Sequence, residues 1–256
     1  MEVSRIMGRY FERPTVPTSL SKALQLLSTL ADETRPMSIR QIAASSELPR
    51  TTVHRLVSEM REAGLVESIP EGHRLGLRLF ELGGTALRQH HVEALARPYM
   101  EELFERTHYT VQLAVLQDTD ILYLARVGHQ GHRRVASHVG GRVPATCTAA
   151  GKALLAFDAA ALHQALSFGL VTRTRHSVTD PKILRQSLVE TRRTHVAYDV
   201  EEARVGLVCA ASPLFIDGRA RFALSASTDV ETFDPRMIGT AVRRTALRLS
   251  KVLSSN

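Results

Sequence analysis

The chain has 256 residues, enough for one or two domains, with 44% hydrophobic and 23% charged residues, as in an ordinary globular protein. No uninterrupted apolar stretch reaches the roughly 18 residues of a membrane helix, so we expect no membrane partner. The two cysteines, Cys147 and Cys209, match no CxxC or zinc-binding spacing. These features argue against a membrane protein, a disulfide scaffold and a zinc module, and predict a cytoplasmic protein with two free thiols and no cofactor.

The net charge of +7 favours an anionic partner, but it is unevenly distributed. Residues 1–85 hold 11 Arg/Lys and 10 Asp/Glu, whereas residues 86–256 hold 22 and 16. Within residues 35–55, four arginines stand against a single acid, Glu47. This local cluster, and not the charge of the whole N-terminal part, is the electrostatic indication of a nucleic-acid partner.

The first 64 residues predict an arm followed by three helices. Residues 1–17 contain prolines and no apolar signal-peptide core, which predicts a flexible arm. From residue 19 apolar residues at helical spacing predict a first helix, ended by polar residues 32–36. Ser38 with a glutamine three residues on has the capping-box pattern that opens a second, short helix. Pro49 suits the first turn of a third helix, which a glycine at position 64 would end.

The third helix has the composition of a DNA recognition helix. Its apolar stripe is expected to be buried, and its outward face carries donors and short hydroxyls without an acid: Arg50, Thr51, Thr52, His54 and Arg55. Such a face can enter the major groove and reach base edges and phosphates. A three-helix unit without DNA-binding function has the same periodicity, so the pattern alone leaves both possibilities open.

A β-hairpin is predicted directly after the third helix. Residues 65–69 and 73–77 alternate as strands around a Pro-Glu-Gly turn. A hairpin in this position is typical of a wing, and we expect His73 and Arg74 to form a basic tip that reaches the DNA backbone or the minor groove. The alternative is that the hairpin only packs against the edge of the helical unit.

Three stretches of this half resemble the N-terminal domain of IclR-type transcriptional regulators: SLSKALQLLSTLA, SIRQIAASSELPRTTVHRLVSEMREAGLVE and GHRLGLRLFELG. The string LPRTTVHRLV is the most specific part. The resemblance implies a winged helix-turn-helix over 18–78, a linker helix over 79–90, and an effector-binding and oligomerisation domain over 91–256. The predicted DNA-binding residues are Arg40, Gln41, Arg50, Thr51, Thr52, His54, Arg55, His73 and Arg74.

The remainder predicts an α+β domain. The linker over 79–88 is amphipathic, with an interruption at Gly83 and Gly84. The elements expected after it are a helix over 91–107, strands over 110–116, 121–127 and 133–139, helices over 149–157 and 181–194, a hairpin of 205–216 with 219–227, and a helix over 235–253. Strands and helices mix without a regular βαβ rhythm, so we predict a mixed sheet similar to GAF and PAS domains.

The resemblance to IclR-type regulators extends through VGGRVPATCTAAGKALLAF, AYDVEEARVGLVCAASPLF and ARFALSAS, and covers about residues 19–250. It implies an effector pocket lined by Thr148, Ala149, Ala150, Asp199, Cys209, Ser225 and Ser227. The chain departs from the family at residues 195–197, His-Val-Ala, where Gly-Tyr-Ala is common. This departure puts one wall of the pocket in doubt.

The residue types of this pocket favour a small organic acid. Backbone N–H groups at a helix start near Ala149 and Ala150 favour a carboxylate, and Ser225 and Ser227 share one face of a strand. Alternatively, the serines only satisfy nearby backbone and Cys209 is a small buried hydrophobe. A further basic group consists of His132, Arg133 and Arg134. These side chains either pair with the carboxylate of the effector or form a basic edge exposed to solvent.

We therefore expect an effector-controlled regulator, a repressor or an activator, that binds double-stranded DNA as a homodimer or tetramer on a roughly palindromic operator. Catabolic or carbon-source control is what the resemblance implies. One alternative is a GAF-like redox enzyme that uses Cys147 and Cys209. Another is a ligand-sensing adaptor without DNA binding, against which the basic front over 50–55 argues.

Overall fold

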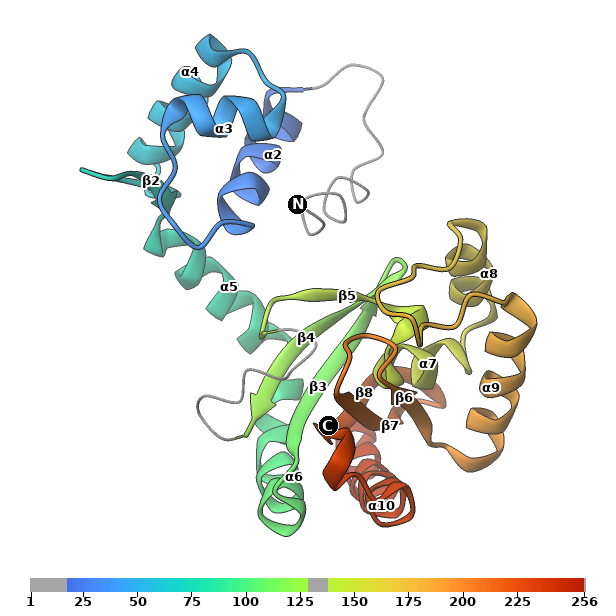
Figure 1. Cartoon of the computed structure of the whole chain (residues 1–256). Coiled ribbons are helices and arrows are strands. Elements are labelled where there is room, and N and C mark those ends of the chain that lie inside the picture. Colours follow the sequence, from blue (N-terminus) through green and yellow to red (C-terminus); the bar gives the residue numbers. More distant parts are fainter. Residues whose placement is uncertain (1–17, 129–137, 256) are drawn as a thin grey trace. The chain divides into compact units, whose positions relative to one another are not determined.

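The computed structural model describes residues 18–128 and 138–255, without the side chains of residues 87–90. The chain divides into two compact units, Met1–Gln89 and His90–Asn256 (Figure 1). Each unit has its own apolar core, and the larger unit has two, one on each face of its sheet. No helix in the described part of the chain is both long enough and apolar enough to cross a membrane.

Unit 1 contains the three predicted helices, the hairpin and the linker helix: α2 (Ser19–Ala31), α3 (Ile39–Ser46), α4 (Arg50–Glu62), β1 (Val66–Ile69), β2 (Gly72–Leu75) and α5 (Leu77–His90). Its core is formed where the apolar stripes of α2, α3 and α4 meet, with Leu26, Ile42 and Val53 fully buried. The three-helix and hairpin prediction is confirmed.

The helix ends of unit 1 follow from local side-chain chemistry. The Ser38 hydroxyl accepts a hydrogen bond from the Gln41 N–H at 3.3 Å, and the Gln41 side chain accepts from the Ser38 N–H at 2.8 Å, so the predicted capping box is present. Pro49 directly precedes α4 and does not lie in its first turn. Gly64 has a φ of +73° just after the last helical residues, a conformation that favours glycine at a helix end.

The linker helix α5 is continuous, so the predicted interruption at Gly83 and Gly84 is wrong. An interior glycine costs a helix only about 1 kcal/mol relative to alanine, which other contacts can offset. Here the Thr85 hydroxyl donates to the Glu81 carbonyl at 3.0 Å, and Arg78 pairs with Glu81 at 2.6 Å one turn apart. The helix also begins at Leu77, two residues earlier than predicted.

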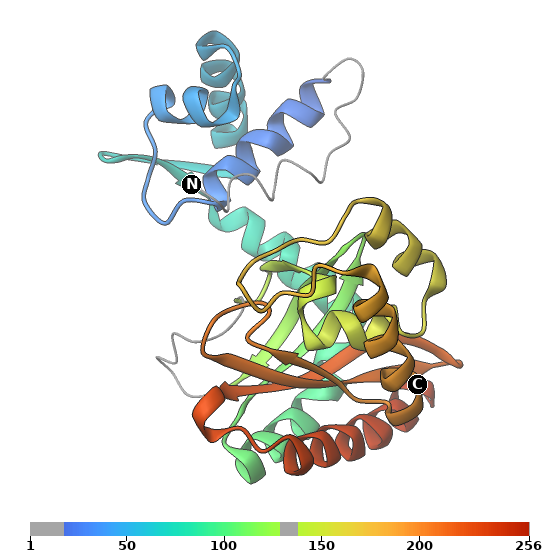
Figure 2. The same cartoon turned by 45° about the vertical axis from the view of Figure 1, so that its right-hand side comes forward.

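Unit 2 is built on a six-stranded antiparallel sheet with the order β5-β4-β3-β8-β7-β6. Its elements are α6 (Val92–Thr107), β3 (Thr110–Gln117), β4 (Asp120–Val127), β5 (Arg142–Pro144), α7 (Ala149–Leu155), α8 (Ala159–Ser167), α9 (Pro181–Thr194), β6 (Ala197–Val200), β7 (Leu207–Ile216), β8 (Arg219–Asp229) and α10 (Pro235–Ser254). Helices α6 and α10 pack on one face of the sheet, and α7 packs on the other with α8 and α9 beyond it. In Figure 2 the red helix α10 runs along one face.

Most elements of unit 2 match the prediction, including the β7–β8 hairpin around Asp217 and Gly218, which both have positive φ. Three elements were missed, among them the four-residue edge strand β6, which pairs with β7. Strand β5 has only three residues and owes its conformation to pairing with β4. Helix α8 is alanine-rich and begins where the Asp158 carboxylate accepts the Ala161 N–H at 2.9 Å. The strand predicted over 133–139 falls largely outside the described residues.

Candidate functional site

The outward face of α4 carries most of the predicted DNA-binding residues. Arg50, Thr51, His54 and Arg55 are exposed, whereas Thr52 is half-buried. The opposite face of the helix is fixed in the core by Val53, Leu56, Val57 and Met60. Since the buried stripe sets the rotation of the helix, the exposed donors must project together into solvent. Arg40 on α3 is also exposed.

The predicted residues Gln41 on α3 and Arg55 on α4 already have partners within this unit. The Gln41 side chain accepts from both the N–H and the hydroxyl of Ser38 at 2.8 Å, which uses its oxygen in the helix cap. Arg55 forms an ion pair of 2.6 Å with Glu59, one turn further along α4. Glu59 was not among the predicted residues, although the i, i+4 spacing of opposite charges predicts such a pair. A phosphate must therefore compete with Glu59 for the Arg55 guanidinium.

The basic tip predicted for the hairpin is wrong. The register pairs Ile69 with Gly72, so the turn consists of Pro70 and Glu71. His73 lies within β2, where its backbone exchanges two hydrogen bonds of 2.8 Å with Met37. Arg74 projects from the same strand and pairs with Glu67 on β1 at 2.7 Å. The error arose from starting the second strand one residue late, which moved both basic residues toward the turn.

In unit 2, the predicted pocket residues lie on the face of the sheet that α7 covers. Strand register places Asp199, Cys209, Ser227 and Thr110 side by side across four neighbouring strands. All four are buried. Side chains alternate along a strand, so Ser225, two residues from Ser227, shares this face and pairs with Gln112 on β3. The sheet thus presents a compact group of polar side chains to α7.

The serine hydroxyls of this group have backbone partners. Ser225 Oγ lies 3.5 Å from the Gln112 carbonyl oxygen, and Ser227 Oγ lies 3.3 Å from that of Thr110. Both distances exceed the 2.7–2.8 Å that hydroxyl donors usually adopt. Such long bonds are weak, so a ligand acceptor can replace them at little cost.

Tyr123 on β4 and Arg173 in the segment before α9 belong to the same region and were not predicted from the sequence. Burial raises the pKa of Tyr123 well above its ordinary value, and the nearby Cys209 and Asp199 raise it further. The Arg173 guanidinium donates to the Ala203 carbonyl at 3.2 Å, and its charge opposes part of the rise in the pKa values of Tyr123 and Cys147. These mutual effects indicate that the phenol, both thiols and Asp199 share one region, with a cation at its border.

The start of α7 closes this region from the other side. Thr148 caps the helix, because its hydroxyl accepts the Gly151 N–H at 3.0 Å. Ala149 and Ala150 are buried, and as the first two helical residues their N–H groups have no partner within the helix. Gly151 packs so closely that a Cβ would overlap the carbonyl oxygen of Ala145. The predicted residues of the loop and helix are thus held by tight backbone packing.

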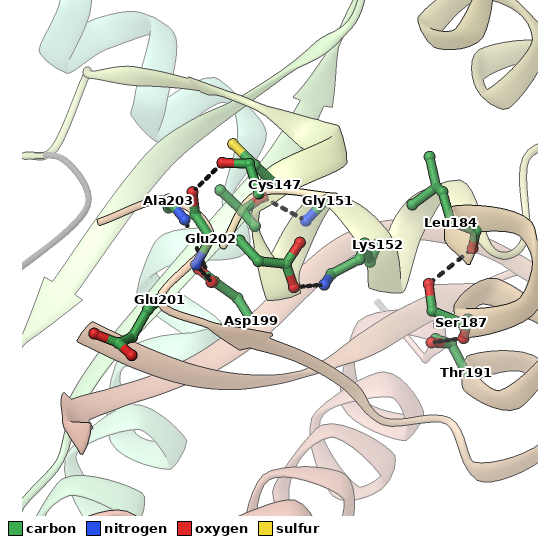
Figure 3. A network of polar contacts seen from close by, with 12 residues as sticks. Cys147, Gly151, Lys152, Leu184, Ser187, Thr191, Asp199, Glu201, Glu202 and Ala203 are labelled. Carbon is green, nitrogen blue, oxygen red and sulfur yellow. Dashed lines mark hydrogen bonds and ion pairs between the residues drawn. The ribbon is translucent and has the colours of Figure 1, made fainter. Parts of the chain in front are cut away.

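A buried carboxylate network links the sheet to α7 (Figure 3). Asp199 Oδ1 accepts the backbone N–H groups of Glu202 at 2.7 Å and Ala203 at 3.4 Å. The Glu202 side chain is ion-paired with Lys152 of α7, and both are almost fully buried. Burial raises the pKa of Asp199 to about 7, with Glu202 adding to the shift and Lys152 and the two N–H groups opposing it. Lys152 and Glu202 were not predicted from the sequence, because their pairing joins positions fifty residues apart.

The thiols are protonated at neutral pH. Burial, followed by the charge of Asp199, raises the pKa of Cys147 to about 12 and raises that of Cys209 well above its ordinary value. The Cys147 thiol donates to the Pro144 carbonyl at 3.3 Å. A reactive cysteine needs a lowered pKa and access to solvent, and neither cysteine has them.

The remaining predicted features lie away from this region or outside the described residues. His195, at the departure from the family pattern, is the left-handed residue that ends α9, with a φ of +58°. Its ring stacks on Phe157 at 5.4 Å, outside the polar group. A glycine is favoured at such a position, so at residue 195 the departure concerns a helix end. His132, Arg133 and Arg134 belong to residues 129–137, outside the described part.

Comparison with known proteins agrees with this organisation. The model described as "IclR helix-turn-helix domain" matches residues 19–70, and the one described as "Bacterial transcriptional regulator IclR C-terminal" matches residues 84–251. The transcriptional repressor IclR of Escherichia coli (strain K12) is 30% identical over 86% of each chain. The acetate operon repressor of Salmonella typhimurium (strain LT2) is 30% identical over 80% of this chain and 77% of its own.

Among solved structures, an IclR homologue from Microbacterium hydrocarbonoxydans, crystallised in complex with 4-hydroxybenzoate, superposes with a TM-score of 0.83. It is 28% identical and covers 93% of this chain and 100% of its own. The family models account for both units, and the family consists of transcriptional regulators and not enzymes, which sets aside the redox alternative. The chain belongs to the IclR family of DNA-binding transcriptional regulators, with a helix-turn-helix domain followed by an effector domain.

Proposed function

We propose that this regulator is controlled by a small organic acid bound between the sheet of unit 2 and the start of α7. The observation that carries the proposal is the buried polar row on that face, above all Asp199, Cys209 and Ser227 on adjacent strands. Burial of polar groups costs free energy, so a cluster of them with weak internal bonds suits a site that a polar ligand completes. Ser225, Thr148, Ala149 and Ala150 belong to the same proposed site.

The chemistry of the site fits a carboxylate. The N–H groups of Ala149 and Ala150 and the Tyr123 hydroxyl are donors, and Arg173 supplies positive charge at the border. Asp199 is the acid whose charge would repel a carboxylate, and its raised pKa allows it to be protonated near neutral pH. A protonated Asp199 is a donor, and its free oxygen can then face an anionic ligand. The structure bound to 4-hydroxybenzoate, an aromatic carboxylic acid, supports the same ligand class.

The DNA-binding part of the proposal assigns Arg40, Arg50 and Arg55 to phosphates or guanines, and Thr51, Thr52 and His54 to base edges. His73 and Arg74 remain proposed contacts from the side of the hairpin, and Gln41 from the start of α3. Relatives that control carbon metabolism, such as the acetate operon repressor, support a catabolic or carbon-source operon as the target. The proposed domain limits stay at 18–78, 79–90 and 91–256.

We further propose a homodimer, or a tetramer of two such dimers, on a palindromic operator. Helices α2 and α5 expose large apolar side chains: Leu20 is 70% exposed, Leu77 78% and Phe80 79%. Exposed apolar side chains at helical spacing are suited to packing against a second copy. A symmetric dimer reads symmetric half-sites, so self-association and a palindromic operator belong together.

The test combines DNA binding with matched variants. Purified protein is titrated onto the DNA upstream of its own gene in gel-shift and footprinting assays, at stated salt, with and without a panel of organic acids. We expect one acid to change the affinity, and Ser225→Ala combined with Ser227→Ala to remove that response without weakening DNA binding. Ser212→Ala is the matched control, because Ser212 is buried on the neighbouring strand but pairs with Leu224 of the opposite core.

Two results would contradict the proposal. If only uncharged ligands raise the melting temperature of the protein, the organic-acid class is wrong. If the serine pair and the Ser212 control lose the response equally, the polar face is a structural feature and not the ligand site.

A further inference from the structure

A groove of about 610 Å³ opens along the free edge of the sheet, where β6 lies between α9 and α10. It lies outside the polar face described above, since Tyr198 and Val196 line it while their neighbours Ala197 and Asp199 point to the α7 side. Its volume is within the range of small-molecule sites, about 300–1,000 Å³. The size therefore suits a metabolite.

Two arginines of α10 give the groove its charge. Arg236 and Arg243 are seven residues apart, so they lie on the same side of the helix, and both line the groove. Within residues 18–128 and 138–255 neither has a carboxylate partner. Arg243 donates one hydrogen bond of 3.4 Å to the Thr194 carbonyl, the last residue of α9. Most of the donors of both guanidinium groups remain available to a ligand.

The acidic side chain that lines the groove, Glu190, already has a cationic partner outside the groove. Glu190 of α9 pairs with Arg193 at 2.5 Å, and this hydrogen bond lowers the pKa of Glu190. Glu190 therefore stays ionised and bound to its own partner, so it does not compete for Arg236 and Arg243. The balance of charge around the groove is positive, which favours an anion.

The start of α10 contributes no free N–H groups to this balance. The Asp234 carboxylate accepts the N–H groups of Arg236 and Met237, both at 3.0 Å, and so caps the helix. Anion recognition would thus rest on the guanidinium side chains. Because both arginines come from one helix, the separation of their Cα atoms is fixed before a ligand binds.

An aromatic wall supplies the apolar part of the groove. The Tyr198 hydroxyl donates to the Pro235 carbonyl at 2.9 Å, and its ring meets Phe233 edge-on at 6.2 Å. Gly239 lets α10 approach this ring, because a Cβ there would overlap the Tyr198 hydroxyl. Burial raises the pKa of Tyr198, so the phenol stays neutral and adds no negative charge.

We propose that this groove is a second ligand site, for a small organic anion whose acidic group binds Arg236 and Arg243 and whose apolar body lies against Tyr198 and Val196. This site is separate from the pocket on the α7 face and does not depend on it. It is nevertheless connected to that pocket through Lys152, which lines the groove and pairs with Glu202, whose backbone N–H binds Asp199. An anion in the groove attracts the Lys152 ammonium and so acts on the network beside Asp199.

The test uses 4-bromobenzoate, an organic anion whose bromine can be located in crystals by anomalous scattering. Calorimetry measures its binding to the full-length protein and to Arg236→Gln, Arg243→Gln and Arg244→Gln. We expect Arg236→Gln and Arg243→Gln each to lower the affinity of the groove for 4-bromobenzoate about tenfold. This is the loss typical of one charge-assisted hydrogen bond. Arg244→Gln removes the same charge from an exposed position of the same helix that does not line the groove, and we expect no change.

The location of bromine distinguishes the two proposed sites. A bromine peak beside Arg236 and Arg243, together with the calorimetric losses, supports the groove site whether or not the α7-face pocket is also occupied. A peak in the α7-face pocket alone, or no peak at all, overturns it. A groove peak without any calorimetric loss in Arg236→Gln and Arg243→Gln indicates binding at crystal concentration only, and also overturns it. If sedimentation shows that Arg236→Gln and Arg243→Gln change the oligomeric state while Arg244→Gln does not, the groove is an interface between copies and the proposal fails.

Discussion

Replacing the buried carboxyl of Asp199 by an amide should make unit 2 more stable at alkaline pH. Asp199 is 1% exposed, and its pKa is about 7 in the folded chain against an ordinary 3.8. In Asp199→Asn the side-chain oxygen can still accept the Glu202 N–H, so the main backbone contact is retained. What the substitution removes is the cost of burying a negative charge.

The size of the effect follows from the difference between the two pKa values. Between about pH 4 and 7 the folded state holds a proton on Asp199 that the unfolded state has lost, so the free energy of unfolding falls as pH rises. A difference of about 3 units at 1.36 kcal/mol per unit amounts to about 4 kcal/mol. The stabilising contribution is present at pH 4 and is lost as the pH rises through 7.

Urea unfolding followed by circular dichroism at pH 4, 6 and 8 measures this difference between the natural chain and Asp199→Asn. We expect the difference in the free energy of unfolding between Asp199→Asn and the natural chain to increase by about 4 kcal/mol, in favour of the variant, from pH 4 to pH 8. Asp217→Asn, in the exposed turn between β7 and β8, is the control for the loss of a carboxylate and should show no such gain. If the free energy of unfolding changes with pH in the same way in all three proteins, the assignment of a raised pKa to Asp199 is refuted.

Three further predictions concern DNA binding, the α7 start and the fold of unit 1. Arg55→Ala should weaken DNA binding and reduce the slope of log affinity against log salt by about 1, whereas Arg61→Ala at the other end of α4 should do neither. Equal slopes in all three proteins would exclude a phosphate contact of Arg55. Gly151→Ala should remove the effector response but keep DNA binding, because a Cβ there meets the Ala145 carbonyl; an unchanged response in gel shifts would contradict this packing argument. Ser38→Ala should destabilise unit 1 by about 1 kcal/mol in thermal unfolding, and no loss would mean that the capping box contributes nothing.

Local chemistry made the DNA-binding unit predictable. The Ser38 capping pattern, the apolar stripe around Val53 and the glycine at position 64 each specify a feature within a few residues, and all three are present. The errors came where a long-range partner decides the outcome. His73 was misplaced because its position depends on strand register and on a backbone pairing with Met37.

In unit 2 the alternation of side chains predicted that Ser225 and Ser227 share one face of a strand, and the strand register brings Asp199 to the same face through Cys209. The Lys152–Glu202 pair was not predictable, since neither residue lies in a local motif and only the packing of α7 on the sheet brings them together. The short strand β5 was missed for the same reason, because its three residues are extended only by virtue of pairing with β4.

Effector control of DNA binding requires that the two ligands, the organic acid and the operator, change each other's affinity reciprocally. Fluorescence anisotropy measures the affinity for operator DNA with and without a saturating organic acid, and calorimetry measures the affinity for that acid with and without DNA. If the acid controls DNA binding through unit 2, both affinities must change by the same factor, and a coupling of about 1–3 kcal/mol corresponds to roughly 5- to 150-fold. An acid that binds unit 2 while leaving operator affinity unchanged would contradict the account.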